Sequence, residues 1–279
     1  MIPATPPPSQ ETENATCAKE AITLSMLASG SKGNAIYVSN GETSLLIDAG
    51  LSGSELQRRM ASRNLKAERL DAIIVSHEHS DHVSGVGVLS RRFGIPIYIN
   101  RKTMAAAKER IGNVKSVIHF ECGAPFQIRN LTCHPFPISH DAEDPAGFTL
   151  QHNGFKIGVA TDLGIATKVV KEHLKQCRLV VLEANHDPEM LINGPYSWPL
   201  KQRIKGRTGH LSNEESRDLI SEIRHDQLSH VVLAHMSEEN NTPEKAIARV
   251  REALHNGKTH LTLATQTEGT PLIHVERIG

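Results

Sequence analysis

Aromatic residues are scarce in this chain: Phe, Tyr and Trp together make up 4% of its 279 residues. The hydrophobic fraction of 38% can still supply a sizeable core, which must then consist mainly of Ile, Leu, Val and Ala. Long apolar runs are also missing, since none approaches the roughly 20 residues that cross a bilayer. The first residues carry neither a basic segment nor an apolar one. We therefore expect no secretory signal and no membrane partner.

An excess of charge is absent too, because 31 Lys and Arg residues balance 31 Asp and Glu residues. A nucleic acid would therefore have to bind a local basic patch rather than a molecule that is basic throughout. The four cysteines are scattered without a CxxC pair, which excludes a zinc knuckle and a disulfide framework. Reduced thiols and a cytoplasmic location are the expectation that follows.

Short segments separated by Gly, Asn and Pro organise the chain. Residues 1–20 are rich in Pro, Thr, Glu and Ser and are predicted to be a disordered tail, whereas no linker divides residues 21–279, which are predicted to be one domain. The first short strands predict an antiparallel meander, followed by a helix with a capping box at Ser54. The second half shows the same pattern of short strands and helices, with a hairpin turn at Asn153-Gly154. Two such halves predict two sheets packed face to face with helices outside.

The densest group of metal-binding side chains is the stretch HEHSDH, from His77 to His82, which directly follows an apolar strand predicted at Ala72–Val75. If the extended geometry continues, His77, His79 and Asp81 point the same way, because strand side chains alternate between faces. His82 then starts the next turn. Imidazole and carboxylate ligands suit Zn, Fe or Mn better than Mg or Ca. Four ligands exceed the need of one catalytic ion, so the stretch predicts a two-metal centre.

Three further polar residues stand directly after predicted buried strands, where the edges of sheets present side chains to a crevice. His140 follows the run FPIS, Asp162 follows GVAT, and His235 follows VVLA. One such residue alone would be an ordinary loop residue. Three in the same context, added to the histidine stretch, predict the remaining ligands of the centre.

Together these residues resemble a known ligand series. The metallo-β-lactamase fold orders its ligands as this chain does, from about residue 21 to the C-terminus: His77, His79, Asp81, His82, His140, Asp162 and His235. The resemblance implies an α/β fold, a four-layer αββα sandwich of two mixed β-sheets. It also implies that His140 joins the first two histidines on one divalent ion. His235 would join Asp81 and His82 on the other ion, and Asp162 would bridge the two.

The type of ligand narrows the chemistry within that fold. Diiron oxygen-reducing relatives carry a carboxylate where this chain has His79, so the all-histidine motif implies hydrolysis rather than redox chemistry. The lactamases proper use a Cys ligand, and no Cys falls at a matching place here. Asp48 matches the family's strand-end Asp, which orients the motif loop without binding metal.

A second resemblance lies between the bridging Asp and the last ligand. The segment from Gly209 to Asn213, one helix ahead of His235, is similar to a segment of the nuclease branch, which includes tRNA-processing enzymes of the RNase Z type. The resemblance implies that His210 donates a proton at the scissile phosphate and that Glu183 orients it. Longer matches, among them the turn at Ser29–Asn34, resemble the YycJ/WalJ group of bacterial DNA exonucleases.

A basic segment before His210 supports a phosphodiester substrate independently of that resemblance. Four cations alternate there with other residues: Lys201, Arg203, Lys205 and Arg207. If the segment is extended, all four point to one side and can bind backbone phosphates without reading sequence. Tyr196 and Trp198 lie just upstream and could stack on a base.

These observations predict a metal-dependent hydrolase, a two-metal phosphodiesterase that cleaves DNA rather than RNA as an exonuclease. Two Zn or Mn ions, or Fe, about 3.5–4 Å apart would share the attacking hydroxide. His210, held by Glu183, would protonate the leaving oxygen, and Asp81 would assist as a base. Three alternatives stay open: a hydrolase of small esters or small phosphodiesters, a tRNA-processing ribonuclease, and a regulatory protein that keeps the metals for stability. The sequence fixes neither the metal nor the oligomeric state. The residues by themselves also leave open whether DNA or RNA is cleaved, whether cleavage is exo or endo, and its polarity.

Overall fold

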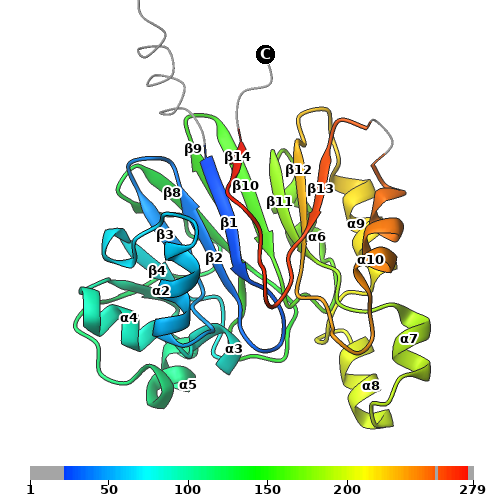
Figure 1. Ribbon diagram of the computed structural model, residues 1–279, viewed down its shortest axis with the longest axis horizontal. Coiled ribbons are helices and arrows are strands. Elements are labelled where there is room, and N and C mark those ends of the chain that lie inside the picture. Colours follow the sequence, from blue (N-terminus) through cyan, green and yellow to red (C-terminus); the bar gives the residue numbers. More distant parts are fainter. Residues whose placement is uncertain (1–21, 255–256, 276–279) are drawn as a thin grey trace, which may run out of the picture.

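The computed structural model describes residues 22–254 and 257–275, so the tail predicted at residues 1–20 lies outside the described part. Two seven-stranded sheets pack face to face, and helices cover their outer faces (Figure 1). This arrangement confirms the predicted four-layer αββα sandwich. None of the helices in the described ranges is long and apolar enough to cross a bilayer.

The first sheet combines the N-terminal half with one strand from the end of the chain. In spatial order its strands are β14 (Ile273–Val275), β1 (Ile22–Ala28), β2 (Ala35–Ser39), β3 (Ser44–Ile47), β4 (Ala72–Ile74), β5 (Ile97–Ile99) and β6 (Val117–His119). β1, β2 and β3 pair antiparallel, which confirms the meander, and β3 to β6 run parallel. The helices of this half are α2 (Gly53–Ala61), η1 (Ala67–Arg69), α3 (Ser80–Val83), α4 (Val86–Phe93) and α5 (Arg101–Ile111).

Helix α2 does not begin with a capping box at Ser54, so that prediction is wrong. Ser52 caps the helix instead, because its side-chain oxygen accepts a hydrogen bond from the Glu55 backbone N–H at 3.3 Å. Ser54 already lies within the first turn. The side chain of Gln57 donates to the Gly53 carbonyl at 2.8 Å rather than reaching back to a cap.

The second sheet is built from the C-terminal half. In spatial order its strands are β13 (His260–Leu263), β12 (His230–Ala234), β11 (Leu179–Glu183), β10 (Phe155–Ala160), β9 (Ala146–His152), β8 (Leu131–Pro137) and β7 (Phe126–Ile128). Strands β7 to β10 pair antiparallel, and β10 to β13 run parallel. The helices of this half are α6 (Lys168–Leu174), α7 (Pro188–Asn193), α8 (Trp198–Lys205), α9 (Asn213–Ile223) and α10 (Pro243–Arg251).

The hairpin between β9 and β10 turns at the two residues that the sequence indicated. Asn153 and Gly154 both have positive φ, at 46° and 80°. A two-residue turn of type I′ requires this conformation at both positions, which is why Asn-Gly is favoured there. The turn fixes the register of β10 against β9, and so fixes which residue of β10 lies at the edge of the sheet.

The core between the sheets is mostly aliphatic, as the composition predicted, and it also contains a group of aromatic side chains. The rings of Tyr98 and Phe126 stack at 5.2 Å between centroids, and Phe120 contacts both Phe126 and Phe148. Two further apolar clusters fill the space between each sheet and its helices. Both sheets are therefore covered on both faces, so only the edges and the strand ends remain open to solvent.

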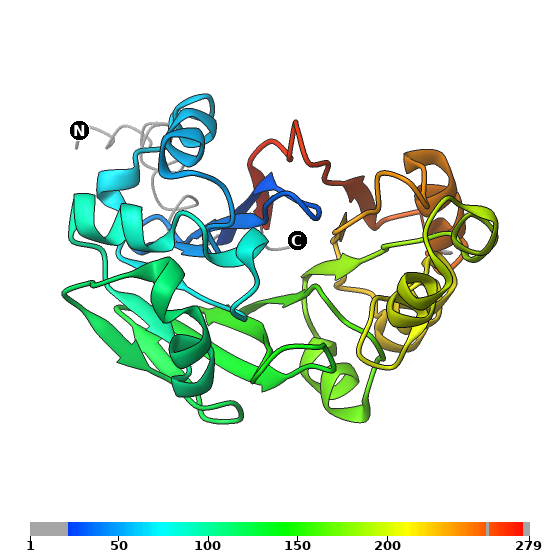
Figure 2. The same ribbon diagram turned by 90° about the horizontal axis from the view of Figure 1, so that it is seen from below.

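The carboxyl ends of the parallel strands in the two halves reach the same edge of the sandwich. Figure 1 shows this edge at the bottom, with α3 on one side and α7 and α8 on the other. Figure 2 looks onto the edge from below, where loops and short helices of both halves surround it. Such an edge is where α/β proteins commonly place their ligand sites.

Candidate metal centre

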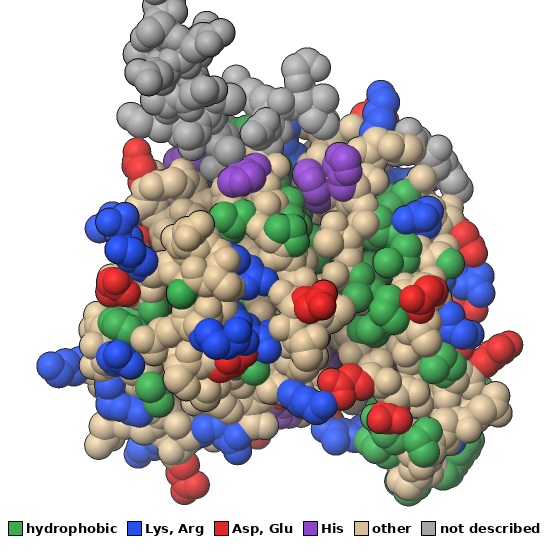
Figure 3. Space-filling view, viewed as in Figure 1, with side chains coloured by type: hydrophobic (Ala, Val, Ile, Leu, Met, Phe, Trp, Pro, Cys, Tyr) green, Lys and Arg blue, Asp and Glu red, His purple; other side chains and the backbone are tan. Residues whose placement is uncertain are grey.

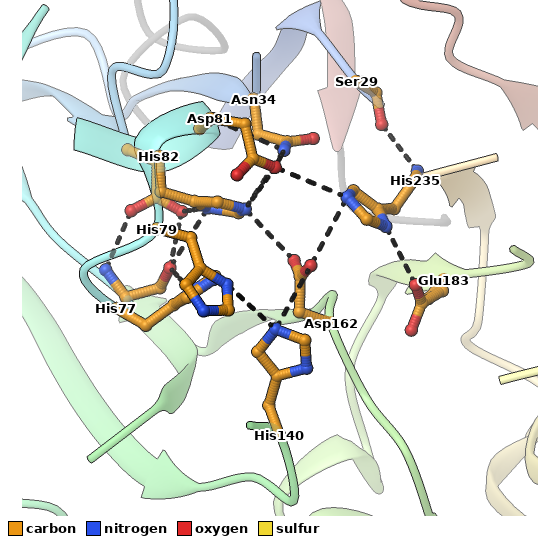
Figure 4. A network of polar contacts seen from close by, with 12 residues as sticks. Ser29, Asn34, His77, His79, Asp81, His82, His140, Asp162, Glu183 and His235 are labelled. Carbon is orange, nitrogen blue, oxygen red and sulfur yellow. Dashed lines mark hydrogen bonds and ion pairs between the residues drawn. The ribbon is translucent and has the colours of Figure 1, made fainter. Parts of the chain in front are cut away.

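Side chains from the ends of several strands meet at this edge (Figure 4). The motif histidines follow β4, and the other contributors follow strands of the second sheet: His140 after β8, Asp162 after β10 and His235 after β12. All seven side chains predicted as ligands fall into overlapping groups whose ligand atoms lie within 4.8 Å of one another. The structure thus brings together residues that are up to 158 positions apart in the sequence.

Three histidines form the first of these groups. The Nε2 atom of His77 lies 3.1 Å from Nδ1 of His79, which lies 3.3 Å from Nε2 of His140. Burial is the main cause that lowers the pKa of His77 and of His140, and neighbouring imidazoles lower that of His77 further. Both rings are therefore neutral at pH 7. A neutral imidazole is the form that binds a metal ion.

Asp81, His82 and His235 form the second group. Oδ2 of Asp81 lies 3.3 Å from Nε2 of His82 and 3.7 Å from Nε2 of His235. We expected Asp81 to continue the strand geometry, and this prediction is wrong. Ser80 begins the short helix α3, and the backbone N–H of His82 donates to the carbonyl of His79. The helical turn, rather than alternation along a strand, directs Asp81 and His82 into the centre.

Asp162 lies between the two groups. Its Oδ2 atom is 3.3 Å from Nε2 of His82, and its Oδ1 atom is 3.3 Å from Nε2 of His235 and 3.9 Å from Nε2 of His140. Burial alone would lower the pKa of His82, but the carboxylates of Asp162 and Asp48 outweigh it and raise that pKa well above its usual value. The concentration of negative charge that stabilises a protonated imidazole also attracts a divalent cation.

The donor set fits a metal ion. Among the described residues, Oδ2 of Asp162 and Nε2 of His235 are buried and make no hydrogen bond of good geometry, although each lies 3.3 Å from an ion-pair partner. Leaving buried polar atoms of this kind unpaired costs about 1–3 kcal/mol each. Both atoms are directed into the centre (Figure 4), where a cation would satisfy them. Nitrogen and carboxylate oxygen donors in this number suit Zn, Mn or Fe.

Three of the imidazoles are tied down through their Nδ1 atoms. Nδ1 of His82 donates to Oδ2 of Asp48 at 2.7 Å, and Nδ1 of His140 donates to the backbone carbonyl of Gly209 at 3.3 Å. Nδ1 of His235 donates to Oε1 of Glu183 at 2.9 Å. Each bond fixes the tautomer and the orientation of its ring, and leaves Nε2 to face the centre.

Asp48 occupies the position that the sequence indicated, directly after β3. Its carboxylate accepts a hydrogen bond from the Ser76 backbone N–H at 2.8 Å and from the Ser76 hydroxyl at 2.7 Å, besides the bond from His82. Asp48 therefore holds the beginning and the end of the motif loop at once. This geometry agrees with an orienting role.

Asn34 also supports the centre, and sequence reasoning did not single it out. Its Nδ2 atom lies 3.0 Å from Oδ2 of Asp81 and 3.0 Å from Nε2 of His82, and its backbone N–H donates to the Asp81 carbonyl at 2.7 Å. Gly50 packs against the same carbonyl so closely that a Cβ atom there would overlap it. The only sequence signal was the turn from Gly30 to Asn34, which gives no hint of a contact 47 residues away.

Glu183 links the metal centre to His210. Its Oε1 atom accepts hydrogen bonds from Nδ1 of His210 at 2.7 Å and from Nδ1 of His235 at 2.9 Å, and Oε2 accepts from the backbone N–H groups of Leu163 and Leu211. Burial would raise the pKa of Glu183, but the two imidazoles outweigh it and lower that pKa well below its usual range. Burial would likewise lower the pKa of His210, but Glu183 raises it.

Glu183 and His210 also lie within ligand distance of Asp162 and His235. The carboxylate of Glu183 is already committed to four hydrogen bonds, and Nδ1 of His210 is committed to Glu183. The remaining nitrogen of His210, Nε2, is the atom left for a substrate. His210 lines the cavity together with His140 and His235.

The basic segment before His210 is not extended, so the predicted row of four cations is wrong. Residues 198–205 form helix α8, in which alternate side chains point in divergent directions. Lys201 donates to the Ile192 carbonyl at 2.6 Å, and Arg203 pairs with Asp141 at 2.6 Å. Lys205 and Arg207 are exposed. Of the four, Arg203 is the one that lines the cavity.

Three residues of the centre have left-handed backbone conformations. Asp48, Asp162 and His235 have φ values of 60°, 56° and 52°. A residue with a Cβ atom is uncommon in this region, and its strain persists only where the surroundings enforce it. Asp48 and His235 stand immediately after a strand and Asp162 one residue later, where the chain turns so that the side chain enters the centre.

The comparisons with known proteins agree with this geometry. Residues 43–236 match the model of the beta-lactamase superfamily domain. The chain is 38% identical over 233 residues to the exodeoxyribonuclease YycJ of Bacillus anthracis, covering 83% of this chain and 88% of that protein. It is also 38% identical over 226 residues to the exodeoxyribonuclease WalJ of Streptococcus pneumoniae, covering 80% and 84%.

A solved structure shows the same fold. The metallo-beta-lactamase fold protein YhfI from Bacillus subtilis superposes with a TM-score of 0.71 at 16% identity, over 91% of this chain and 99% of that one. The chain therefore belongs to the beta-lactamase superfamily, and within it to the group that contains YycJ and WalJ.

Gly50→Ala should disrupt the centre from outside it. The added methyl group overlaps the Asp81 carbonyl and forces α3 away, so we expect a loss of about 1–3 kcal/mol in the free energy of unfolding and weaker metal binding. Chemical denaturation and metal analysis measure the two effects. Gly206→Ala is the milder comparison, because a Cβ there lies 3.2 Å from the nearest backbone oxygen atoms and needs only a small shift, whereas one at Gly50 overlaps the Asp81 carbonyl. Equal behaviour of the two variants would contradict the assignment.

Proposed function

We propose that this protein is a metal-dependent exonuclease that hydrolyses the phosphodiester bonds of DNA. The observation that carries the proposal is the 38% identity to two exodeoxyribonucleases over most of each chain, in a protein whose cluster of seven potential ligands is complete. The pairing of His210 with Glu183 beside that cluster supports it further. No contact in the site favours a small ester over a nucleic acid.

We infer two divalent ions, Zn or Mn, with Fe as the third choice. His77, His79 and His140 would hold one, and Asp81, His82 and His235 the other, with Asp162 shared between them. Bound there, divalent ions supply Lewis acidity and an activated water at neutral pH. The distances within the two groups and the unpaired Asp162 Oδ2 and His235 Nε2 atoms support this arrangement.

The proton at the leaving oxygen is assigned to His210. Glu183 accepts the hydrogen bond from Nδ1, so the imidazole is held with Nε2 available to the substrate. The carboxylate also stabilises the protonated ring from which the proton leaves. Asp81 is assigned as a ligand that also assists as a base, and Asn34 holds its carboxylate in place at 3.0 Å.

The basic residues are assigned unequal parts in DNA binding. Arg203 lines the cavity, and its guanidinium, which also pairs with Asp141, would contact a phosphate next to the scissile bond. Lys205 and Arg207 are exposed beyond the cavity and would contribute attraction to the backbone that salt screens. Lys201 is bound to the Ile192 carbonyl and would add positive charge only.

A digestion assay tests the proposed activity. Linear DNA, circular DNA and RNA are each incubated with Zn, Mn or a chelator, and the products are separated on a gel. We expect linear DNA to shorten with a divalent ion and circular DNA to stay intact, because an exonuclease needs a strand end. Digestion that continues after complete removal of the metal would refute the mechanism. Cleavage of the circle would refute the exonuclease assignment.

Two histidine variants should separate metal binding from proton transfer. His79→Ala removes a ligand, so metal content and cleavage should be lost together. His210→Ala should keep its metal and lose about 10²–10⁴-fold in kcat, the usual contribution of a general acid. Metal analysis and single-turnover kinetics measure both. His119→Ala, an exposed histidine on β6, serves as the control and should match the unaltered protein. Loss of metal from His210→Ala would overturn the assigned role.

Arg203→Gln should weaken DNA binding more than Lys205→Gln does, although both remove one charge from the same helix. The first change removes a cation from the cavity, and the second removes one from the exposed face. We expect the KM for linear DNA to rise about tenfold for Arg203→Gln and less than about twofold for Lys205→Gln. Steady-state kinetics at fixed salt measure this. Equal increases would show that the helix acts only through its overall charge.

A further inference from the structure

Helix α8 is unusual in that none of its residues is buried. Leu200 and Ile204, four positions apart, share one face of the helix and are only half-buried. Together with Tyr196, which precedes the helix, they line the same cavity as the metal-binding side chains. An apolar helix face normally packs on a core. Here it lines part of a cavity that histidines and carboxylates also line.

This face is held firmly in position. Arg203 bonds to Asp141 through both Nε and Nη2 at 2.6 Å, and Asp141 directly follows the ligand His140. The Ser139 hydroxyl donates to the Arg207 carbonyl at 2.7 Å, and the His210 N–H donates to the Ile204 carbonyl at 2.9 Å. The apolar face is therefore fixed in the same cavity as the metal-binding side chains.

The two parts of the lining suit a ligand whose two ends differ in chemistry. One end must carry negative charge for the metal side, and the other must be flat and weakly polar for Tyr196, Leu200 and Ile204. The cavity volume is about 260 Å³, which is below the size usual for drug-sized ligands. A single nucleotide has this shape: a phosphate joined to one planar base.

We propose that Tyr196, Leu200 and Ile204 form a subsite for the base of the terminal nucleotide, with the Tyr196 ring stacked on that base. The inference rests on the proposed function and deepens it, because the enzyme then holds one unpaired nucleotide at the strand end while the adjoining phosphate is cleaved. Stacking tolerates every base, since each has a π-face. The subsite therefore selects a strand end without selecting a sequence.

Trp198, the other aromatic residue of this segment, has no part in the subsite. Its side chain is 65% exposed and it does not line the cavity. Ile192 on α7 is 52% exposed. Apolar side chains gather at the lower right of Figure 3, over the region of α7 and α8. Trp198 thus supplies a matched control two residues from Tyr196.

Binding of two small probes tests the subsite without any cleavage. Metal-loaded protein is titrated calorimetrically with deoxyadenosine 5′-monophosphate and with deoxyribose 5-phosphate, which lacks the base. We expect the nucleotide to bind about tenfold more tightly, the order expected for one stacked base. Tyr196→Ala should abolish the difference, while Tyr196→Phe and Trp198→Ala should keep it. Metal content and melting temperature confirm that each variant is folded.

Equal affinity of the two probes for the unaltered protein would overturn the subsite. So would a preference that survives in Tyr196→Ala or disappears equally in Trp198→Ala. DNA digestion by the same preparation is scored separately. A protein that prefers the nucleotide but digests no DNA would keep the subsite and refute the proposed function. A protein that digests DNA but does not prefer the nucleotide would keep the proposed function and refute the subsite.

Discussion

Hydrogen bonds from buried imidazoles to fixed oxygen atoms are the interactions on which the rest of the centre depends. His82, His140 and His235 each donate Nδ1 to an acceptor that the fold holds in place. Without these bonds the rings could rotate, and the Nε2 atoms would no longer converge. Glu183 matters most among the acceptors, because one of its oxygen atoms positions a ligand and also the residue assigned to proton transfer. Changes at Glu183 would therefore affect metal binding and catalysis together.

Much of this site could be predicted because its ligands follow buried strands. Polar residues at the ends of apolar runs indicated His140, Asp162 and His235, and the fold brings these ends to one edge. Asn34 could not be found in this way, since an amide in a turn acquires its meaning only through contacts across the sheet. Glu183 and His210 required the resemblance to a family, because a Gly-His pair and a strand-end Glu are common.

Two of the errors share a physical cause, which is that local geometry is set by short helices with little sequence signal. Helix α3 has four residues, yet it redirects Asp81. Helix α8 buries none of its residues, so it shows no apolar face packed on a core, and we expected an extended segment there. The longer helices and strands were predicted well because their apolar spacing reports on real packing. The apolar face of α8 does not pack on the core, so the helix was not predicted. For the same reason this face is free to line the cavity.

The left-handed backbone at Asp48, Asp162 and His235 has a consequence for the evolution and engineering of this protein. Glycine would adopt these torsion angles without strain, and Asn would do so more readily than His. A search for greater thermostability would therefore be drawn to these positions first, and would dismantle the centre. Such substitutions would raise the free energy of unfolding. The strained torsion angles lower that free energy, and in return they direct these three side chains into the centre.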